Sequence, residues 1–267
     1  MERTKTTLII DMEKLHNTQF RFSDRVEDYV AYRPGYPSDA IDFICNEVKL
    51  SDNAVVADVG AGTGISAIYF ADRGYKVYGI EPDEAMRRAS KAYIKSNFLP
   101  LYGTDVAIPL PEHSVDMVIT AQAFHWFDIT DFRKECIRIL QPEGKLCIMW
   151  NDRDESDALQ KEYTQIIDKY NVDYYKVHHH RISDDIIEEF FFPSECIKKS
   201  FAYEQKFDEE GLIGRLASCS YMPSRTDSNF PDVINAAKEL FNKFQCEGFI
   251  TFAYHTRIYI GKLNSRI

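Results

Sequence analysis

Three glycines alternate along the stretch VADVGAGTG, which begins as an apolar run and ends as a loop. Gly60, Gly62 and Gly64 follow the run, and Asp58 lies inside it. Because glycine has no Cβ, such a loop turns tightly and lets its backbone approach a ligand closely. The dinucleotide-binding pattern places its third glycine three residues after the second, where this chain has Ile65. The stretch therefore predicts a loop that binds a nucleoside without a pyrophosphate, the alternative being a tight turn without a ligand.

Three carboxylates are candidates for contacts with such a nucleoside. Glu81 ends the next predicted strand, 21 residues after Gly60, where an acid can accept both ribose hydroxyls. Its alternative role is that of a solvated residue at a strand end. Asp105 follows a third strand and can accept an adenine amino group or simply stabilise a turn. Asp58 must be hydrogen-bonded if it is buried, either to the loop backbone or to a ligand.

The segment QAFHWFD follows the fourth predicted strand and carries a candidate catalytic residue. His125 can take a proton from a hydroxyl or amine acceptor, or donate a hydrogen bond to a carboxylate acceptor. A structural histidine packed on aromatic neighbours is the alternative. Phe124 and Trp126 are expected to form apolar walls for a substrate.

Two further segments carry candidate ligand contacts. EDYVAYRPGYP supplies Tyr29, Tyr32 and Arg33 before a proline-bounded turn. The arginine can bind a carboxylate of a cofactor or substrate, or form a structural ion pair. SYMPSR supplies Tyr221 and Arg225 as candidate substrate contacts.

Strand-like and helix-like segments alternate up to about residue 150, which predicts β-α-β crossovers and a parallel sheet. The predicted strands cover residues 55–59, 75–81, 98–102, 115–122, 146–150 and 201–207, with a last one inside 248–263. The expected fold is therefore α/β, with a doubly wound, mostly parallel sheet of seven strands. We expect a single domain, residues 1–267, with a helical cap at about residues 151–230. Ligands of such sheets lie at the carboxyl ends of the strands.

Composition narrows the class of protein. The chain has 267 residues and a formal net charge of −10 at pH 7. A negative surface repels phosphates, so we expect a small-molecule substrate and no nucleic-acid partner. The six cysteines form no C-x-x-C pair, which predicts free thiols in a reducing compartment. No apolar run resembles a leader or reaches the roughly 20 residues that span a bilayer, so we expect a cytoplasmic protein without membrane contact.

Two charged patterns are expected to have no catalytic role. The run His178–His180 cannot direct all three rings to one ion on a regular element, so we expect no metal site. The acidic cluster DRDESD at 152–157 is expected to form an exposed face or a helix start.

Several motifs in this order resemble class I S-adenosylmethionine-dependent methyltransferases. They are VADVGAGTG, IEPDEAM, TDVAIPLPEHSVDMVITAQAFHWFD and the RILQPEGKL turn. The resemblance is closest to the small-molecule branch that includes trans-aconitate methyltransferase-like proteins. It covers most of residues 22–150, with weaker similarity in SCSYMPS and the last strand.

The resemblance implies a Rossmann-like methyltransferase fold and S-adenosylmethionine as cofactor. It implies that the three loop glycines line the cofactor, that Glu81 binds the ribose, and that Asp105 and Val106 flank the adenine. An aromatic-rich N-terminal segment covers the cofactor in such proteins. The full set of predicted cofactor contacts is Asp58, Gly60, Ala61, Gly62, Gly64, Glu81, Pro82, Met86, Asp105, Val106, Gln122, Tyr32 and Arg33.

The predicted function is methyl transfer by in-line displacement to an oxygen or nitrogen of a small molecule. Carboxylate, phenol and amine acceptors all remain open. A nicotinamide-dependent oxidoreductase is the first alternative, disfavoured by Ile65 and by the lack of a Tyr-x-x-x-Lys pair after the fourth strand. A protein that binds S-adenosylmethionine without catalysis is the second.

Overall fold

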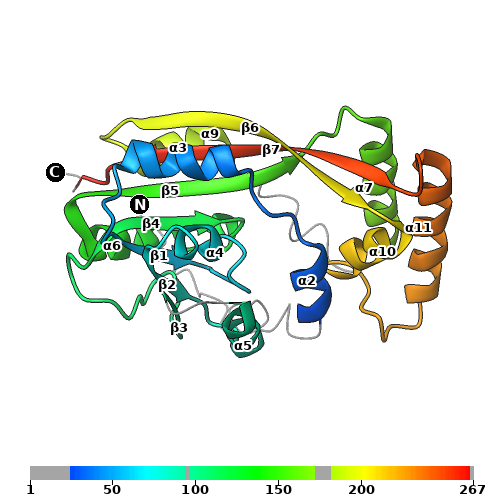
Figure 1. Ribbon diagram of the computed structural model, residues 1–267, viewed down its shortest axis with the longest axis horizontal. Helices are drawn as coiled ribbons and strands as arrows, with labels where there is room; N and C mark the ends of the chain where they lie inside the picture. Colours follow the sequence, from blue (N-terminus) through cyan, green and yellow to red (C-terminus); the bar gives the residue numbers. More distant parts are fainter. Residues whose placement is uncertain (1–24, 94–96, 172–181, 265–267) are drawn as a thin grey trace, which may run out of the picture.

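A seven-stranded sheet forms the centre of the molecule (Figure 1). The computed structural model describes residues 25–93, 97–171 and 182–264; the run His178–His180 lies outside them. The strand order is β3-β2-β1-β4-β5-β7-β6, in which β7 runs antiparallel to both β5 and β6 and the other neighbours are parallel. The prediction of a mostly parallel α/β sheet of seven strands is confirmed.

The strands that lie at the centre of the sheet are apolar on both faces. The bounds of all seven strands are β1 Val55–Val59, β2 Lys76–Ile80, β3 Phe98–Leu101, β4 Val115–Ala121, β5 Leu140–Arg153, β6 Cys196–Phe207 and β7 Ile250–Gly261. Continuous apolar runs such as those of β1 and β4 are typical of parallel strands with both faces covered. β3 contains Pro100, which it tolerates because it is the edge strand and need not donate on its free side.

The fifth strand is longer than predicted. The sequence predicts a turn at QPEGK before a strand at 146–150, but β5 begins at Leu140 and its pairing with β4 shifts register across that segment. At its other end β5 continues to Arg153, because it pairs with β7 as far as Arg153 opposite Tyr254. This extension carries three polar residues past the predicted strand end.

Two hydrophobic cores fill the two faces of the sheet. The helices near the sheet are α3 Ser38–Val48, α4 Ala67–Ala71, α5 Glu84–Tyr93, α6 Ile129–Ile139 and α9 Asp184–Phe191. α3 and α4 pack apolar side chains such as Ile44 and Phe70 against one face. α6 and α9 cover the opposite face with Phe132 and Phe190.

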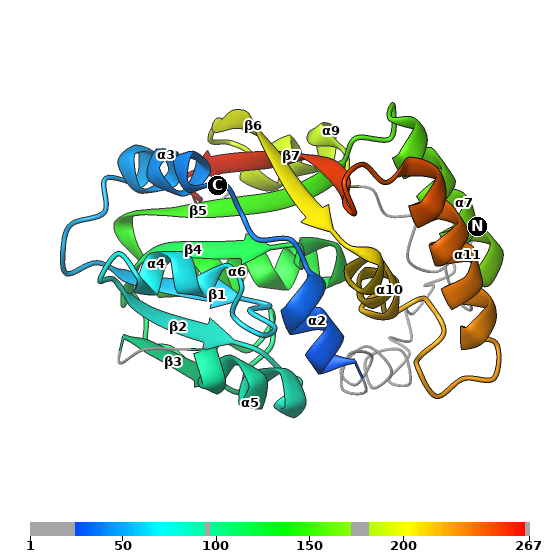
Figure 2. The ribbon, with the colours of Figure 1, turned by 45° about the vertical axis from the view of Figure 1, so that its right-hand side comes forward.

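Three helices form a separate cluster at one end of the molecule (Figures 1 and 2). They are α7 Ala158–Tyr170, α10 Glu209–Ala217 and α11 Phe230–Phe244, and they share a third core with the ends of β6 and β7. The segment 151–230, expected as a helical cap, thus contains α7, α9 and α10 but also β6. β6 belongs to the sheet because it pairs with β7 along its whole length.

The first described helix, α2 Val26–Tyr32, is attached to this cluster. Arg25 donates to the carbonyl oxygens of Cys219 and Met222, and Asp28 accepts a bidentate pair from Arg225 at 2.6 and 2.8 Å. The α2–α10 contact is close, since a Cβ on Gly214 would lie 2.1 Å from the Tyr32 ring. α2 and α10 therefore form one wall beside the strand ends.

Within the described ranges, no helix combines the length and apolar character needed to cross a bilayer. All six cysteines are unpaired; three of them are buried, namely Cys136, Cys147 and Cys219. The same ranges hold no group of three or more His, Cys, Asp or Glu side chains suited to a metal ion.

Candidate active site

Two adjoining cavities lie at the carboxyl ends of the parallel strands. The smaller has a volume of about 160 Å³ and the larger about 270 Å³. Five residues line both cavities and form a shared wall: Tyr29, Gly60, Ala121, Gln122 and Trp126. One site can therefore hold two molecules in contact.

The glycine loop forms part of the wall of both cavities. Gly60, Gly62 and Gly64 have φ values of +73°, +56° and +85°, a region that side-chain-bearing residues rarely adopt. The Gly60 amide donates to the carbonyl of Ile80 at 2.9 Å, which ties the loop to β2. Gly60 and Gly62 line the smaller cavity, whereas Gly64 turns the chain toward α4 and lies outside both cavities.

Replacing Gly60 with alanine is expected to lower the free energy of unfolding by about 2–4 kcal/mol. The new Cβ would lie 2.5 Å from the Ala123 Cβ, and the backbone would be strained at φ +73°. Gly74→Ala is the matched control, because Gly74 has φ +93° and a methyl group added there would have nothing within 4 Å, so it should cost only about 1 kcal/mol. Urea denaturation measures the free energy of unfolding of both variants. Equal losses would show that the contact with Ala123 is unimportant.

Glu81 lies at the mouth of the smaller cavity, directly after β2. Its Oε2 accepts the Gly62 amide at 2.8 Å and its Oε1 accepts the Asp83 amide at 2.9 Å. Burial raises the pKa of Glu81 to about 7, although these two backbone hydrogen bonds favour the carboxylate. The carboxylate is thus fixed by the loop and by the start of α5, and its remaining lone pairs are available to a ligand.

Other predicted cofactor contacts surround the same cavity. Pro82, Met86, Asp105 and Gln122 line it. Asp105 accepts the Asp128 amide at 2.7 Å, and burial raises its pKa. Of the described residues in this lining, none is a lysine or arginine.

Asp58 is fully buried behind the loop and lies outside both cavities. Its Oδ2 accepts the Ser66 hydroxyl at 2.5 Å, whereas its Oδ1 has no hydrogen-bond partner among the described residues. Burial raises the pKa of Asp58 to about 7, opposed by the Ser66 hydrogen bond. These contacts favour a structural role for Asp58, in which it holds the glycine loop, over contact with a ligand.

The raised pKa of Asp58 predicts that stability falls with rising pH. Between its ordinary pKa near 3.8 and about 7, the folded chain holds a proton that the unfolded chain has lost, so the free energy of unfolding decreases over this interval and is level above it. Asp58→Asn should make the decrease smaller, and Glu81, whose pKa burial also raises to about 7, accounts for a part that remains. Asp52→Asn at an exposed turn should leave the decrease unchanged. Urea denaturation at pH 5 and pH 8 compares the three proteins. A slope that Asp58→Asn does not alter would contradict the assignment.

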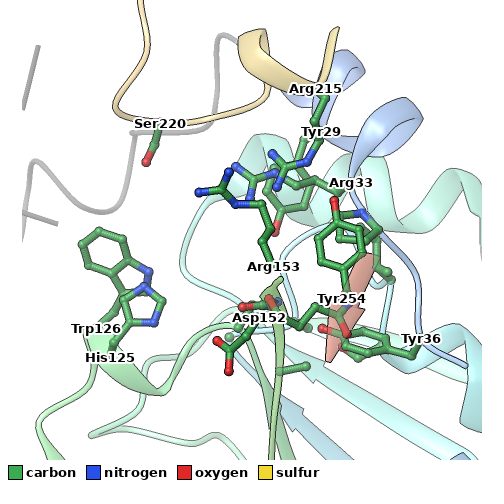
Figure 3. Close-up of a pocket in the computed structure, with 18 of the residues that line it drawn as sticks. Tyr29, Arg33, Tyr36, His125, Trp126, Asp152, Arg153, Arg215, Ser220 and Tyr254 are labelled. Atoms are coloured by element: carbon green, nitrogen blue, oxygen red, sulfur yellow. Dashed lines mark hydrogen bonds between the residues drawn. The ribbon is translucent and has the colours of Figure 1, made fainter. Parts of the chain in front are cut away.

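The larger cavity brings together residues from distant segments (Figure 3). His125 and Trp126 lie on one side, with ring centroids 4.8 Å apart. Tyr29 and Arg33 reach it from α2 and the residue after it, and Tyr221 from the loop after α10. Ala61 lines it too. Predicted catalytic, cofactor and substrate residues therefore meet in one place.

Besides Asp58 and Gly64, four more predicted site residues lie outside the two cavities. Phe124 is completely buried because the 3-10 turn η1 Phe124–Trp126 directs it into the core, 4.9 Å from the Phe190 ring. Arg225 is held by Asp28 in a groove on the outer side of α2, which Tyr32 also lines. Val106 is exposed beyond the cavities.

Several cavity residues were not identified from the sequence. They are Tyr36, Asn151, Asp152, Arg153, Glu155, Arg215 and Tyr254. The expectation that DRDESD forms an exposed face is wrong for its first part, because the extension of β5 places Asp152 and Arg153 at the cavity. Arg215 had a usable signal, since it is the one basic residue in the apolar stretch GLIGRLA.

Comparison with known proteins decides the family of the central segment. Residues 57–148 match the family described as a methyltransferase domain. This segment is a class I S-adenosylmethionine-dependent methyltransferase domain. The methyltransferase domain contains the glycine loop, Glu81, Asp105 and His125, and the match decides against the nicotinamide alternative.

Relatives of the methyltransferase domain support the same assignment. An uncharacterized methyltransferase-like protein of Schizosaccharomyces pombe is 33% identical over 57% of this chain and 59% of its own length. The chain thus spans less than two thirds of this relative. A candidate methyltransferase of Dictyostelium discoideum is 27% identical over 84% of this chain and 85% of its own length.

Solved structures share the fold of the methyltransferase domain. A candidate type II methyltransferase from Anaeromyxobacter dehalogenans superposes with a TM-score of 0.66 at 21% identity, covering 88% of this chain and all of that one. This similarity concerns the fold.

The smaller cavity fits S-adenosylmethionine as the cofactor of the methyltransferase domain. Its apolar wall, which includes Ile80, Met86 and Phe127, suits an adenine ring. Glu81 supplies the carboxylate that ribose hydroxyls require, and the acidic lining would repel a pyrophosphate. The fit therefore agrees with a nucleoside cofactor that carries no phosphate.

Proposed function

We propose that the chain is an active methyltransferase that methylates an oxygen or nitrogen of a small molecule bound in the larger cavity. The observation that carries this proposal is the shared wall of the two cavities, in which Gly60, Gln122 and Trp126 face both. A cavity suited to the nucleoside thus opens onto a second one that is large and polar enough for an acceptor.

The chain's own residues would hold the cofactor by short-range contacts. Gly60 and Gly62 allow close approach of the backbone, Glu81 accepts the ribose hydroxyls, and Asp105 accepts the adenine amino group. When bound, S-adenosylmethionine supplies an electrophilic methyl group. The protein's contribution is to hold the donor and acceptor in line and to exclude water.

His125 is the proposed general base of this reaction. It lines the larger cavity beside Trp126, where its imidazole can receive a proton from the hydroxyl or amine that is methylated. Tyr29, Trp126 and Tyr221 would form the walls that orient the acceptor. The structural alternative for His125 is that it only packs against Trp126.

Two measurements test the proposal. Isothermal titration should show that the purified, folded chain binds S-adenosylmethionine with one site; no binding would refute it. Incubation with methyl-labelled cofactor and a small-molecule extract should then label a metabolite. A chain that binds the cofactor but labels nothing would be a non-catalytic binding protein, the second alternative.

Several finer assignments belong to the same proposal. We infer that residues 1–267 act as one domain and that the protein works in the cytoplasm on a small molecule, without nucleic acid. The support is the six unpaired thiols, which suit a reducing compartment, and the net charge of −10. The similarity to the trans-aconitate methyltransferase-like branch remains a prediction carried by the sequence motifs.

A further inference from the structure

Three arginines from separate elements converge on one part of the larger cavity (Figure 3). Arg33 follows α2, Arg153 ends β5, and Arg215 lies on α10. They lie across the cavity from His125 and Trp126. This gathering of positive charge stands out in a chain whose net charge is −10.

The arginines lack negative partners in the part of the chain that the structure describes. No carboxylate of the described residues forms an ion pair with any of the three. The nearby Asp152 pairs instead with Arg257. Arg215 is only 6% exposed, so its charge is withdrawn from solvent. A buried, uncompensated cation is costly unless another group neutralises it.

Buried hydrogen-bond donors around the arginines also lack partners among residues 25–93, 97–171 and 182–264. They are Arg33 Nε, Arg153 Nη1, Arg215 Nε, Tyr163 Oη and Tyr254 Oη. The three arginines and Tyr254 line the larger cavity, and Arg153 lies 4.9 Å from the centre of the Tyr163 ring behind it. Buried polar groups are normally satisfied, and an unsatisfied set of donors at a cavity wall is a site for an acceptor.

One buried thiol lies against these arginines. Arg215 donates to the Cys219 Sγ at 3.1 Å. Burial opposes ionisation of this thiol, but the charges of Arg215, Arg33 and Arg153 outweigh it and lower the pKa of Cys219. A single thiol cannot compensate three guanidinium groups, and the Cys219 Sγ also donates to the Arg215 carbonyl at 3.4 Å and forms a hydrogen bond with Tyr221.

We propose that the methyl acceptor is a small organic anion, whose carboxylate or phosphate group binds between Arg153 and Arg215. This inference rests on the proposed function and adds the chemical class of the substrate. The anionic group would be the anchor rather than the methylated atom, because the arginines lie across the cavity from His125. Guanidinium groups suit this role, since one guanidinium can donate two parallel hydrogen bonds to the two oxygens of a carboxylate or phosphate group.

The carboxylate of the cofactor does not account for the whole cluster. It carries one negative charge, for which Arg33 is the predicted partner, while its ammonium and sulfonium groups add two positive ones. Binding the cofactor therefore increases the positive charge of the site. Arg153 and Arg215 are left for a second anion.

The test measures anion binding to the protein saturated with S-adenosylhomocysteine, at constant ionic strength. Succinate, citrate and glycerol 3-phosphate are titrated beside the neutral compounds succinamide and glycerol. At least one anion should bind, and the neutral compounds should not. Preference for a dicarboxylate or for the phosphate ester would identify the source of the anionic group.

Arg153→Gln is the informative variant, because Arg153 is half-buried and its side chain contacts the Tyr163 ring but forms no hydrogen bond or ion pair with a described residue. It should weaken binding of the anion about 10- to 100-fold and leave S-adenosylhomocysteine binding unchanged. Arg88→Gln, an equal charge change on the exposed face of α5, should alter neither. Arg215→Ala is avoided because this buried residue also supports Cys219.

Three outcomes would overturn the inference. The wild-type protein would bind S-adenosylhomocysteine but no anion in preference to its neutral counterpart, or Arg153→Gln would bind the anion as well as the wild type does. The third is that Arg153→Gln weakens only S-adenosylhomocysteine, which would assign the arginines to the cofactor carboxylate. Failure to bind S-adenosylhomocysteine would instead refute the proposed function itself.

Discussion

His125→Gln is expected to lower kcat for a hydroxyl or amine acceptor by about 10²- to 10⁴-fold, the usual contribution of a general base. Glutamine keeps the size and polarity of the side chain but cannot take up a proton. Because His125 lines the acceptor cavity rather than the smaller one, the affinity for S-adenosylmethionine should not change. Steady-state kinetics and isothermal titration together separate the two effects.

His255→Gln provides the control for this experiment. His255 is exposed on β7 and lies outside both cavities, so the same chemical change there should leave kcat within about two-fold, as for most surface substitutions. If His125→Gln retains full activity, the acceptor reacts without transferring a proton to His125, and the role of His125 is structural.

Glu81→Gln should weaken the binding of S-adenosylmethionine about 10- to 100-fold. The glutamine nitrogen cannot accept a backbone amide, so either Gly62 or Asp83 loses its hydrogen bond, and one ribose hydroxyl loses a charged acceptor. Isothermal titration measures the effect. Glu84→Gln is the matched control, because Glu84 is exposed in the same segment, where its carboxylate pairs with Arg88.

The same residue predicts how the affinity depends on pH. Burial raises the pKa of Glu81 to about 7, so much of it is protonated in slightly acidic solution. Since the ribose hydroxyls need the carboxylate, affinity should rise from about pH 5.5 and level off near pH 8. In Glu81→Gln this rise should be absent. Asp58 titrates in the same pH range, so Asp58→Asn is the control. If this variant keeps the rise in affinity with pH, Glu81 is responsible for it.

Much of the lining of the smaller cavity could be predicted because it is encoded locally. A strand, a glycine loop and an acid at the next strand end occupy fixed places in a β-α-β unit, so Gly60, Gly62 and Glu81 follow from spacing alone. The side chain of Asp83 caps α5 through the amides of Ala85 and Met86, as its position before the helix indicates.

The larger cavity could be predicted only in part. His125 and Trp126 line it as expected, whereas its arginines are brought there by long-range packing. Arg153 reaches the cavity only because β7 pairs with β5 beyond residue 150, and this register is not visible in the acidic stretch that contains it. Phe124 and Trp126 are neighbours of similar chemistry, yet a short 3-10 turn sends one into the core and the other to the cavity.

One part of the larger cavity is built on a different hydrophobic core from the rest of the site. The residues that line the smaller cavity lie mainly at the ends of β1, β2 and β4, whereas Arg215 and Tyr221 of the larger cavity belong to the cluster of α7, α10 and α11 with its separate core. Substitutions in distant, separately packed regions act nearly independently. Substitutions in the C-terminal helices are therefore expected to reshape the larger cavity while leaving the smaller cavity intact.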